Sequence, residues 1–157
     1  MKRSLRAQRM QPSATLSLVN KAKALKMEGK KVISFAAGEP DFGSPQAACD
    51  AALEAIRSQQ THYTPVAGIP ELREAIRDYY RSRMGLDYPV SQITVGSGGK
   101  PLLYEAIQVV VDPGDEVLLF TPAWVSYVEQ IRLAEGKEVL VDTMSTNLVP
   151  TRESVMR

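Results

Sequence analysis

The hydrophobic residues of the chain follow two kinds of spacing. Apolar positions three and four residues apart are typical of amphipathic α-helices, and short apolar runs bounded by turn residues are typical of strands. The first pattern predicts helices over residues 14–28, 45–58, 70–84, 100–111 and 124–134. The second predicts strands over residues 32–35, 92–95, 116–120 and 138–141.

From residue 92 onwards, the predicted strands and helices alternate strictly. Strands that are joined by helices run parallel to each other, with right-handed crossover connections. We therefore expect an α/β fold with three αβα layers and the start of a mostly parallel sheet.

The ends of the helical segments carry residues that suit helix termini. Ser13 and Ser44 are the expected N-caps, Pro45 is expected in a first turn, and Gly29 follows a helix. A serine hydroxyl accepts a hydrogen bond from a first-turn N–H group, and glycine tolerates the left-handed conformation after the last turn.

The segment 70–84 shows the clearest division into two faces. Its apolar positions are expected to be buried: Leu72, Ala75, Ile76 and Tyr79. Its charged positions are expected to form a solvated face: Glu71, Arg73, Glu74, Arg77 and Arg81.

The composition is that of an ordinary globular protein. The 157 residues are 44% hydrophobic and 24% charged, with a net charge of +1. This charge gives no reason to expect a nucleic acid partner, and no apolar run approaches the length of a membrane span. The one cysteine, Cys49, excludes an intrachain disulfide and fits a reducing compartment, so we expect a cytoplasmic protein.

The N-terminus is basic. Lys2, Arg3, Arg6 and Arg9 precede the first acidic residue, Glu28. Transit peptides share this bias, but no apolar signal-peptide core follows. A mobile basic arm is therefore favoured over a targeting segment.

Residues 95–101, Val-Gly-Ser-Gly-Gly-Lys-Pro, connect a predicted strand to a predicted helix, and we call them the glycine turn. Glycines leave room for a ligand close to the backbone, and the first N–H groups of a helix attract negative charge. A cation such as Lys100 is unfavourable at a helix N-terminus unless an anion lies beside it. The sequence therefore predicts a phosphate site here.

The two common nucleotide fingerprints do not fit the glycine turn. A P-loop needs Ser or Thr after Gly-Lys, but Pro101 follows Lys100. A dinucleotide fingerprint needs a third glycine where Pro101 stands. A phosphorylated ring of another kind remains.

Trp124 follows the next predicted strand. The loops after successive parallel strands lie at the same edge of a sheet, where ligands bind. The indole could stack on a planar ring held by the glycine turn, or it could pack in the core at the start of a helix. The nearby glycine turn favours stacking.

Five segments along the chain form a more specific pattern. They are Pro12-Ser13-Ala14-Thr15, Gly38-Glu39-Pro40-Asp41-Phe42, Tyr63-Thr64-Pro65 with Gly68-Ile69-Pro70-Glu71-Leu72-Arg73, Gly98-Gly99-Lys100, and Asp112-Pro113-Gly114-Asp115-Glu116-Val117. In this order and spacing they resemble the class I aminotransferases of the aspartate aminotransferase family. The resemblance implies pyridoxal 5′-phosphate as cofactor and the fold type I of pyridoxal phosphate enzymes.

The resemblance also implies roles for particular residues. Gly98, Gly99 and Lys100 correspond to the segment that binds the cofactor phosphate, and Trp124 to the aromatic residue stacked on its ring. Lys100 replaces the smaller hydroxyl residue of some members, and a cation there would suit an acidic substrate such as aspartate or glutamate.

Two further roles concern the substrate and a second subunit. Gly38 corresponds to the glycine whose backbone contacts the substrate α-carboxylate. Tyr63 corresponds to a tyrosine that reaches the cofactor phosphate of the neighbouring subunit, which implies a homodimer.

The chain is expected to be the N-terminal part of such an enzyme. Residues 1–44 would form an N-terminal arm, a helix and a short strand of the small domain, and residues 45–157 would begin the large, cofactor-binding domain. The family's cofactor-binding lysine has no counterpart here, so we expect no catalytic residue and no activity from this segment alone. No metal site is predicted.

Three functions stay open. The parent protein could transfer an amino group between an amino acid and a 2-oxo acid, which the motifs favour. It could be a pyridoxal phosphate-dependent lyase on the same fold. The chain could also be a non-catalytic, truncated binding module.

Overall fold

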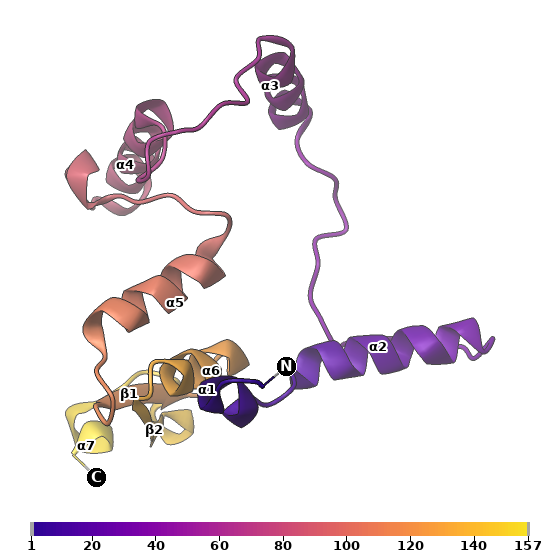
Figure 1. The fold of residues 1–157 in the computed structure, drawn as a ribbon, viewed down its shortest axis with the longest axis vertical. Coiled ribbons are helices and arrows are strands. Elements are labelled where there is room, and N and C mark those ends of the chain that lie inside the picture. The colour runs from indigo at the N-terminus through magenta and orange to yellow at the C-terminus, as the bar shows by residue number, and fades with distance from the viewer. Residues whose placement is uncertain (1, 157) are drawn as a thin grey trace. The chain divides into compact units, whose positions relative to one another are not determined.

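The computed structural model describes residues 2–156, which fall into two compact units (Figure 1). The sheet unit comprises residues up to 38 together with those from 103 onwards, and the loop unit comprises residues 39–102. Each is described by itself. The predicted domain boundary at residue 44 divides the chain differently and stays a prediction.

The sheet unit holds both strands. Helix α5 begins in the loop unit and continues into the sheet unit. The elements of the sheet unit are α1 (Leu5–Arg9), α2 (Ala14–Met27), most of α5 (Gly99–Val110), β1 (Glu116–Thr121), α6 (Val125–Leu133), β2 (Lys137–Asp142), the 3₁₀ helix η2 (Met144–Thr146) and α7 (Arg152–Val155). The loop unit contains α3 (Gln46–Arg57), α4 (Pro70–Met84), the 3₁₀ helix η1 (Val90–Gln92) and the first residues of α5.

Strands β1 and β2 are parallel, and α6 crosses over between them and contacts both (Figure 1). They pair in register from Glu116 with Lys137 to Thr121 with Asp142. The two strands predicted after residue 110 and the helix between them are confirmed. The buried hydrophobic residues of the described chain all belong to this motif: Leu119, Ile131, Ala134 and Val141.

Two threonines join the carboxyl ends of the strands. Buried Thr143 donates from its hydroxyl and from its N–H to the Thr121 carbonyl, at 2.8 and 3.0 Å. The Thr121 hydroxyl donates to the Val141 carbonyl at 3.3 Å. These bonds fix the point at which the chain leaves β1.

The other two predicted strands are wrong. Residues 32–35 are irregular, with Ile33 and Phe35 exposed, and residues 90–92 form η1. A strand requires a neighbour that satisfies its backbone groups, and an apolar run does not supply one. Ile93 has extended dihedrals, but the Val95 N–H donates to the Ala67 carbonyl of a loop at 3.0 Å.

The helices agree with the predictions to within two residues, and one cap differs. The Ser13 hydroxyl accepts from Leu16 N–H at 3.3 Å as expected, and Gly29 has the positive φ of +79°. Ser44 is not an N-cap, because Pro45 has non-helical dihedrals and itself precedes the first helical residue.

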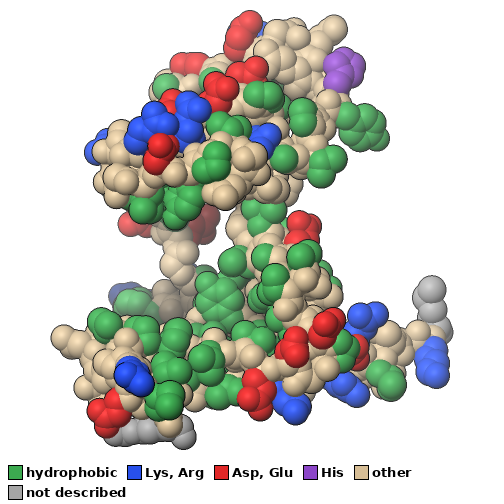
Figure 2. All heavy atoms as spheres, turned by 90° about the vertical axis from the view of Figure 1, so that its left-hand side faces the viewer, with side chains coloured by type: hydrophobic (Ala, Val, Ile, Leu, Met, Phe, Trp, Pro, Cys, Tyr) green, Lys and Arg blue, Asp and Glu red, His purple; other side chains and the backbone are tan. Residues whose placement is uncertain are grey.

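Helix α4 does not have the two faces that its pattern predicts. Leu72 and Tyr79 are 42% and 55% exposed, whereas Arg73 is half-buried. Figure 2 likewise shows many hydrophobic side chains on the surface in view. The burial of Arg73 arises from contacts with residues 90–93, which the periodicity of a helix cannot reveal.

Residues 4–11, within the predicted basic arm, contain a short helix and contact α6. The Ser4 hydroxyl caps α1, which contacts α6, and the Gln11 N–H donates to Glu129 Oε2 at 3.2 Å. Among residues 2–156, no helix is both long and apolar enough to cross a membrane.

Arg132 of α6 links the helix to the sheet. Its guanidinium binds the carboxylate of Glu138 on β2 and, at 3.2 Å, that of Glu129. The hydrogen bond from Arg132 lowers the pKa of Glu138, and the same bond raises the pKa of Arg132.

We predict that Glu138→Gln changes stability in a pH-dependent way. A carboxylate with a lowered pKa stabilises the fold above its unfolded-state pKa of about 4.3, and this stabilisation is lost as pH falls through the folded-state pKa. The variant should lose less than about 1 kcal/mol at neutral pH, because solvent screens the pair, and should converge with wild type in acid. Urea unfolding between neutral and acidic pH measures this difference.

Asp78→Asn is the matched control, since it removes a more exposed acid that pairs with Arg77 on α4. It should leave the unfolding midpoint at neutral pH nearly unchanged. An equal effect of both variants would contradict the stabilising role of the pair between helix and sheet.

Candidate functional site

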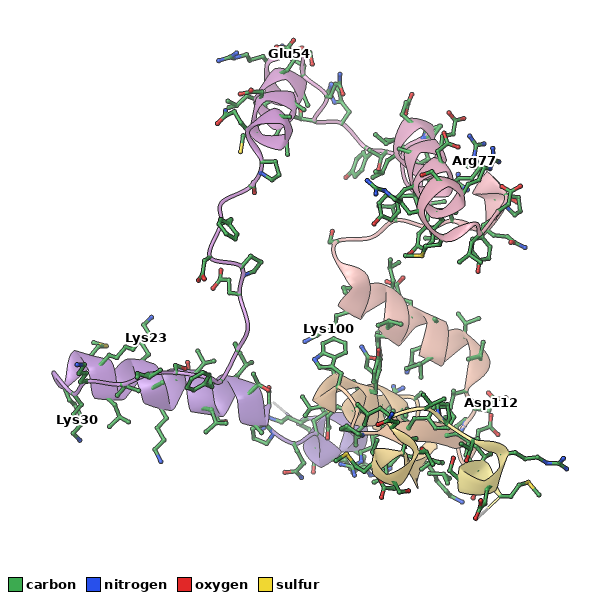
Figure 3. All side chains as sticks on the ribbon, turned by 180° about the vertical axis from the view of Figure 1, so that it is seen from behind. Lys23, Lys30, Glu54, Arg77, Lys100 and Asp112 are labelled. Carbon is green, nitrogen blue, oxygen red and sulfur yellow. The ribbon has the colours of Figure 1, made fainter. Side chains whose placement is uncertain are left out.

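The glycine turn leads directly into α5. Gly98 has a φ of +93°, and its N–H donates to the Gly96 carbonyl at 2.8 Å, which tightens the turn. Helix α5 then starts at Gly99, so the first-turn N–H groups have no carbonyl within the helix to pair with. Residues 96–100 are all exposed, and Figure 3 shows Lys100 at the start of the helix.

Gly96 and Gly99 have different surroundings. A Cβ on Gly96 would lie 2.9 Å from Leu102 Cγ, so glycine lets the turn pack on the first turn of α5. At Gly99 φ is not positive, and nothing lies within 4 Å of the Cβ position. Packing within the described chain therefore does not require glycine at 99, whereas a ligand held against the backbone would.

A second close approach joins the turn to the loop that precedes α4. A Cβ on Gly68 would lie 2.8 Å from Val95 Cβ, and Gly68 has a φ of +98°. Next to this contact, the Val95 N–H donates to the Ala67 carbonyl at 3.0 Å. Glycine at 68 thus allows two backbone segments to touch.

Arg73 binds the segment that leads into the turn. Its Nε donates to the Ile93 carbonyl at 2.8 Å and its Nη2 to the Val90 carbonyl at 2.5 Å. The planar guanidinium suits two acceptors at once. Three contacts of residues 67–73 therefore hold residues 90–95.

The loop unit also carries Tyr63. Its side chain is fully exposed, on a loop beside Thr61 and His62, and that loop reaches the glycine turn through Ala67 and Gly68. The loop unit thus contains the glycine turn and Tyr63 together.

The sheet unit carries Trp124 and Gly38. Trp124 is the N-cap of α6 and follows the end of β1, the edge of the sheet that the sequence predicts for it. The residue is 42% exposed, and its ring meets Tyr127 edge-on, with 5.4 Å between ring centroids. Part of Trp124 is therefore accessible. Gly38 has nothing within 4 Å of its Cβ position.

The roles predicted for these residues stay predictions. Among residues 2–156, no group of three or more His, Cys, Asp or Glu could hold a metal ion. The sequence analysis missed Gly68, Arg73 and Val95 as residues that shape the turn. The signal available was the segment 68–73, which belongs to the aminotransferase-like pattern although its helical periodicity indicates only an amphipathic helix.

Comparisons with known proteins agree with this geometry. A sequence model described as "Aminotransferase class I and II" matches residues 30–148. An aspartate aminotransferase of Geobacillus stearothermophilus is 46% identical over 147 residues, which are 94% of this chain and 37% of the relative. The aspartate/prephenate aminotransferase of Thermus thermophilus is 43% identical over 155 residues, which are 98% of this chain and 40% of the relative.

Solved structures show the same relationship. The aspartate aminotransferase of Thermus thermophilus with maleate has a TM-score of 0.93 and 42% identity, covering 99% of this chain and 41% of that one. The enzyme of Rhizobium meliloti has a TM-score of 0.91 and 38% identity, covering 99% and 39%. The parallel strands and the helix between them are therefore part of the α/β fold of aspartate aminotransferases.

The chain belongs to the class I and II aminotransferase family. It spans about two fifths of the length of these relatives, since it covers 37% to 41% of their chains. The family resemblance of the sequence analysis is confirmed. Aspartate aminotransferases depend on pyridoxal phosphate. In the loop unit, the open turn at Gly99 and the N-terminus of α5 fit a phosphate group. In the sheet unit, the exposed part of Trp124 fits an aromatic ring.

We predict opposite effects on stability for neighbouring glycines of the turn, measured without ligand. Gly98→Ala should cost about 1–2 kcal/mol, because an L-residue is disfavoured at positive φ. Gly99→Ala should be neutral or stabilise by up to about 1 kcal/mol, since its φ is ordinary and it starts a helix. Thermal unfolding of the cofactor-free intact protein compares them, and equal losses would contradict the geometry.

Proposed function

We propose that the protein to which this chain belongs is a pyridoxal phosphate-dependent aminotransferase. It transfers an amino group from an amino acid to a 2-oxo acid, with aspartate or glutamate preferred. The observation that carries the proposal is the similarity to enzymes named aspartate or aspartate/prephenate aminotransferases, which extends over 85% to 98% of the chain.

Within this proposal, the glycine turn holds the phosphate. Gly98 shapes the turn through its bond to the Gly96 carbonyl, and the N–H group of Gly99 at the start of α5 donates to a phosphate oxygen. The dipole of α5 favours the charge of the phosphate, and Lys100 supplies a cation. A ligand phosphate here would remove the electrostatic cost of a lysine at a helix N-terminus.

Trp124 and Gly38 act on the ring and the substrate. The indole of Trp124 stacks on the pyridine ring and orients it, and the backbone at Gly38 binds the substrate α-carboxylate. When bound, the cofactor supplies the chemistry, because its ring withdraws electrons from the substrate α-carbon. The residues of this chain bind and orient, and none of them replaces the lysine that the family uses for proton transfer.

Lys100 also bears on the substrate. A lysine in place of a small hydroxyl residue adds positive charge near the site, which favours a dicarboxylic amino acid. The names of several relatives add prephenate as a second partner, so this acceptor belongs among the candidates. A cytoplasmic location fits the single, exposed Cys49.

The test uses the intact, cofactor-loaded protein with aspartate and 2-oxoglutarate. We expect oxaloacetate and glutamate to form in equal amounts. Without an acceptor, oxaloacetate should stop at about one molecule per bound cofactor, and continued formation would contradict transfer. Ammonia or a product of side-chain cleavage would favour the alternative lyase. No reaction, together with no cofactor binding, would favour a non-catalytic module.

We also propose a homodimer in which Tyr63 serves the phosphate of the partner subunit. Its full exposure in the described chain fits a residue that acts outside its own subunit. Loss of a hydrogen bond to a charged group costs about 1.5–3 kcal/mol, so Tyr63→Phe should weaken cofactor binding by at least about tenfold.

Mixed dimers test this directly. A dimer of one Tyr63→Phe subunit and one Gly98→Ala subunit has an intact glycine turn and an intact Tyr63 in one of its two sites, if the tyrosine acts across the interface. We expect such dimers, isolated with two different tags, to recover the cofactor affinity of wild type at half of their sites. No recovery would place Tyr63 at its own subunit's site.

A further inference from the structure

Arg73, on the charged face of α4, binds main-chain carbonyls, whereas two other arginines of this helix bind carboxylates. Arg77 and Arg81 pair with the carboxylates of Asp78 and Asp87. Arg73 instead donates to two main-chain carbonyls, Val90 at 2.5 Å and Ile93 at 2.8 Å, and is half-buried. Figure 3 shows Arg77 on the same helix for comparison.

The two carbonyls lie in a segment with little other support. Within the described chain, residues 90–95 form no strand, and only four residues lie between Ile93 and Gly98, the residue with positive φ in the glycine turn. A displacement at Ile93 would therefore be transmitted along a short chain to the first N–H groups of α5.

The other contact of this segment comes from the same part of the chain. Gly68 lets the backbone approach Val95, and the Ala67 carbonyl accepts from the Val95 N–H at 3.0 Å. The start of α4 and the residues before it thus hold the segment at both ends.

We propose that Arg73 is a positioning residue for the phosphate-binding turn. Its guanidinium fixes the carbonyls of Val90 and Ile93, and through them the direction in which the N–H groups of the glycine turn point. It touches neither cofactor nor substrate. This inference rests on the proposed function, since it assigns the ligand of the turn to a cofactor phosphate.

The test compares pyridoxamine 5′-phosphate with pyridoxamine, which differ only in the phosphate group. Neither has the aldehyde that reacts with a lysine, so their affinities report non-covalent binding. Both dissociation constants are measured on the cofactor-free intact protein, as wild type, Arg73→Gln and Arg73→Lys. The preference is the ratio of the two constants, pyridoxamine over pyridoxamine 5′-phosphate.

We expect Arg73→Gln to reduce this preference by at least about tenfold, which corresponds to 1.4 kcal/mol, with pyridoxamine itself bound about as before. Arg73→Lys should also reduce it, because a lysine keeps the charge but cannot offer the planar fork to two carbonyls. Arg83→Gln, an exposed arginine in the last turn of α4, is the matched control and should keep the wild-type ratio.

The outcomes separate the two proposals. If wild type shows no preference for the phosphorylated ligand, the proposed cofactor site itself fails. If wild type shows the preference and Arg73→Gln and Arg73→Lys keep it, the positioning role is overturned. Equal weakening of both ligands, or failure of both Arg73 variants to fold, would also overturn it, because Arg73 would then stabilise the fold as a whole.

Discussion

The contact between Gly68 and Val95 is the constraint on which the candidate phosphate site depends. In the part of the chain that the structure describes, residues 93–98 belong to no strand, so no ladder of a sheet holds them. Their position comes from a backbone approach that a side chain at 68 would block, and from the guanidinium of Arg73. Because glycine at 68 also has a positive φ, both space and conformation demand it there.

In the sheet unit, Trp124 is positioned by strand pairing instead of by loop contacts. Parallel pairing of β1 with β2 places the end of β1, and thereby Trp124, relative to the core around Ile131. The threonine bonds between Thr121 and Thr143 extend this pairing past the last ladder residue. Trp124 is thus placed by regular structure, whereas the glycine turn is placed by loop contacts and one side chain.

Sequence reasoning succeeded where the determining forces are local. The helices and the cap at Ser13 follow from spacing and side-chain chemistry within a few residues, and β1 and β2 follow from alternation with the helix between them. The predictions of strands at 32–35 and 92–95 were wrong because strand pairing depends on a partner far along the chain. Arg73 was assigned to solvent for the same reason, since the carbonyls that it binds lie 17 and 20 residues away. The pattern of a strand, glycines and a helix singled out the glycine turn, and the family motifs suggested its ligand. The contacts that support the turn could not be predicted, because they join residues far apart in the sequence.

The hydrogen bond between Arg73 and Val90 also closes a loop of the chain, residues 74–89. Residues 74–89 lie between Arg73 and Val90, which the arginine side chain joins. Within this stretch, Arg81 pairs with Asp87, and Tyr80 contacts Tyr88 edge-on. The length of this loop can therefore change without a change in the geometry of the glycine turn. Evolution or design could lengthen the exposed stretch 85–89, or attach a further element there, without moving the glycine turn.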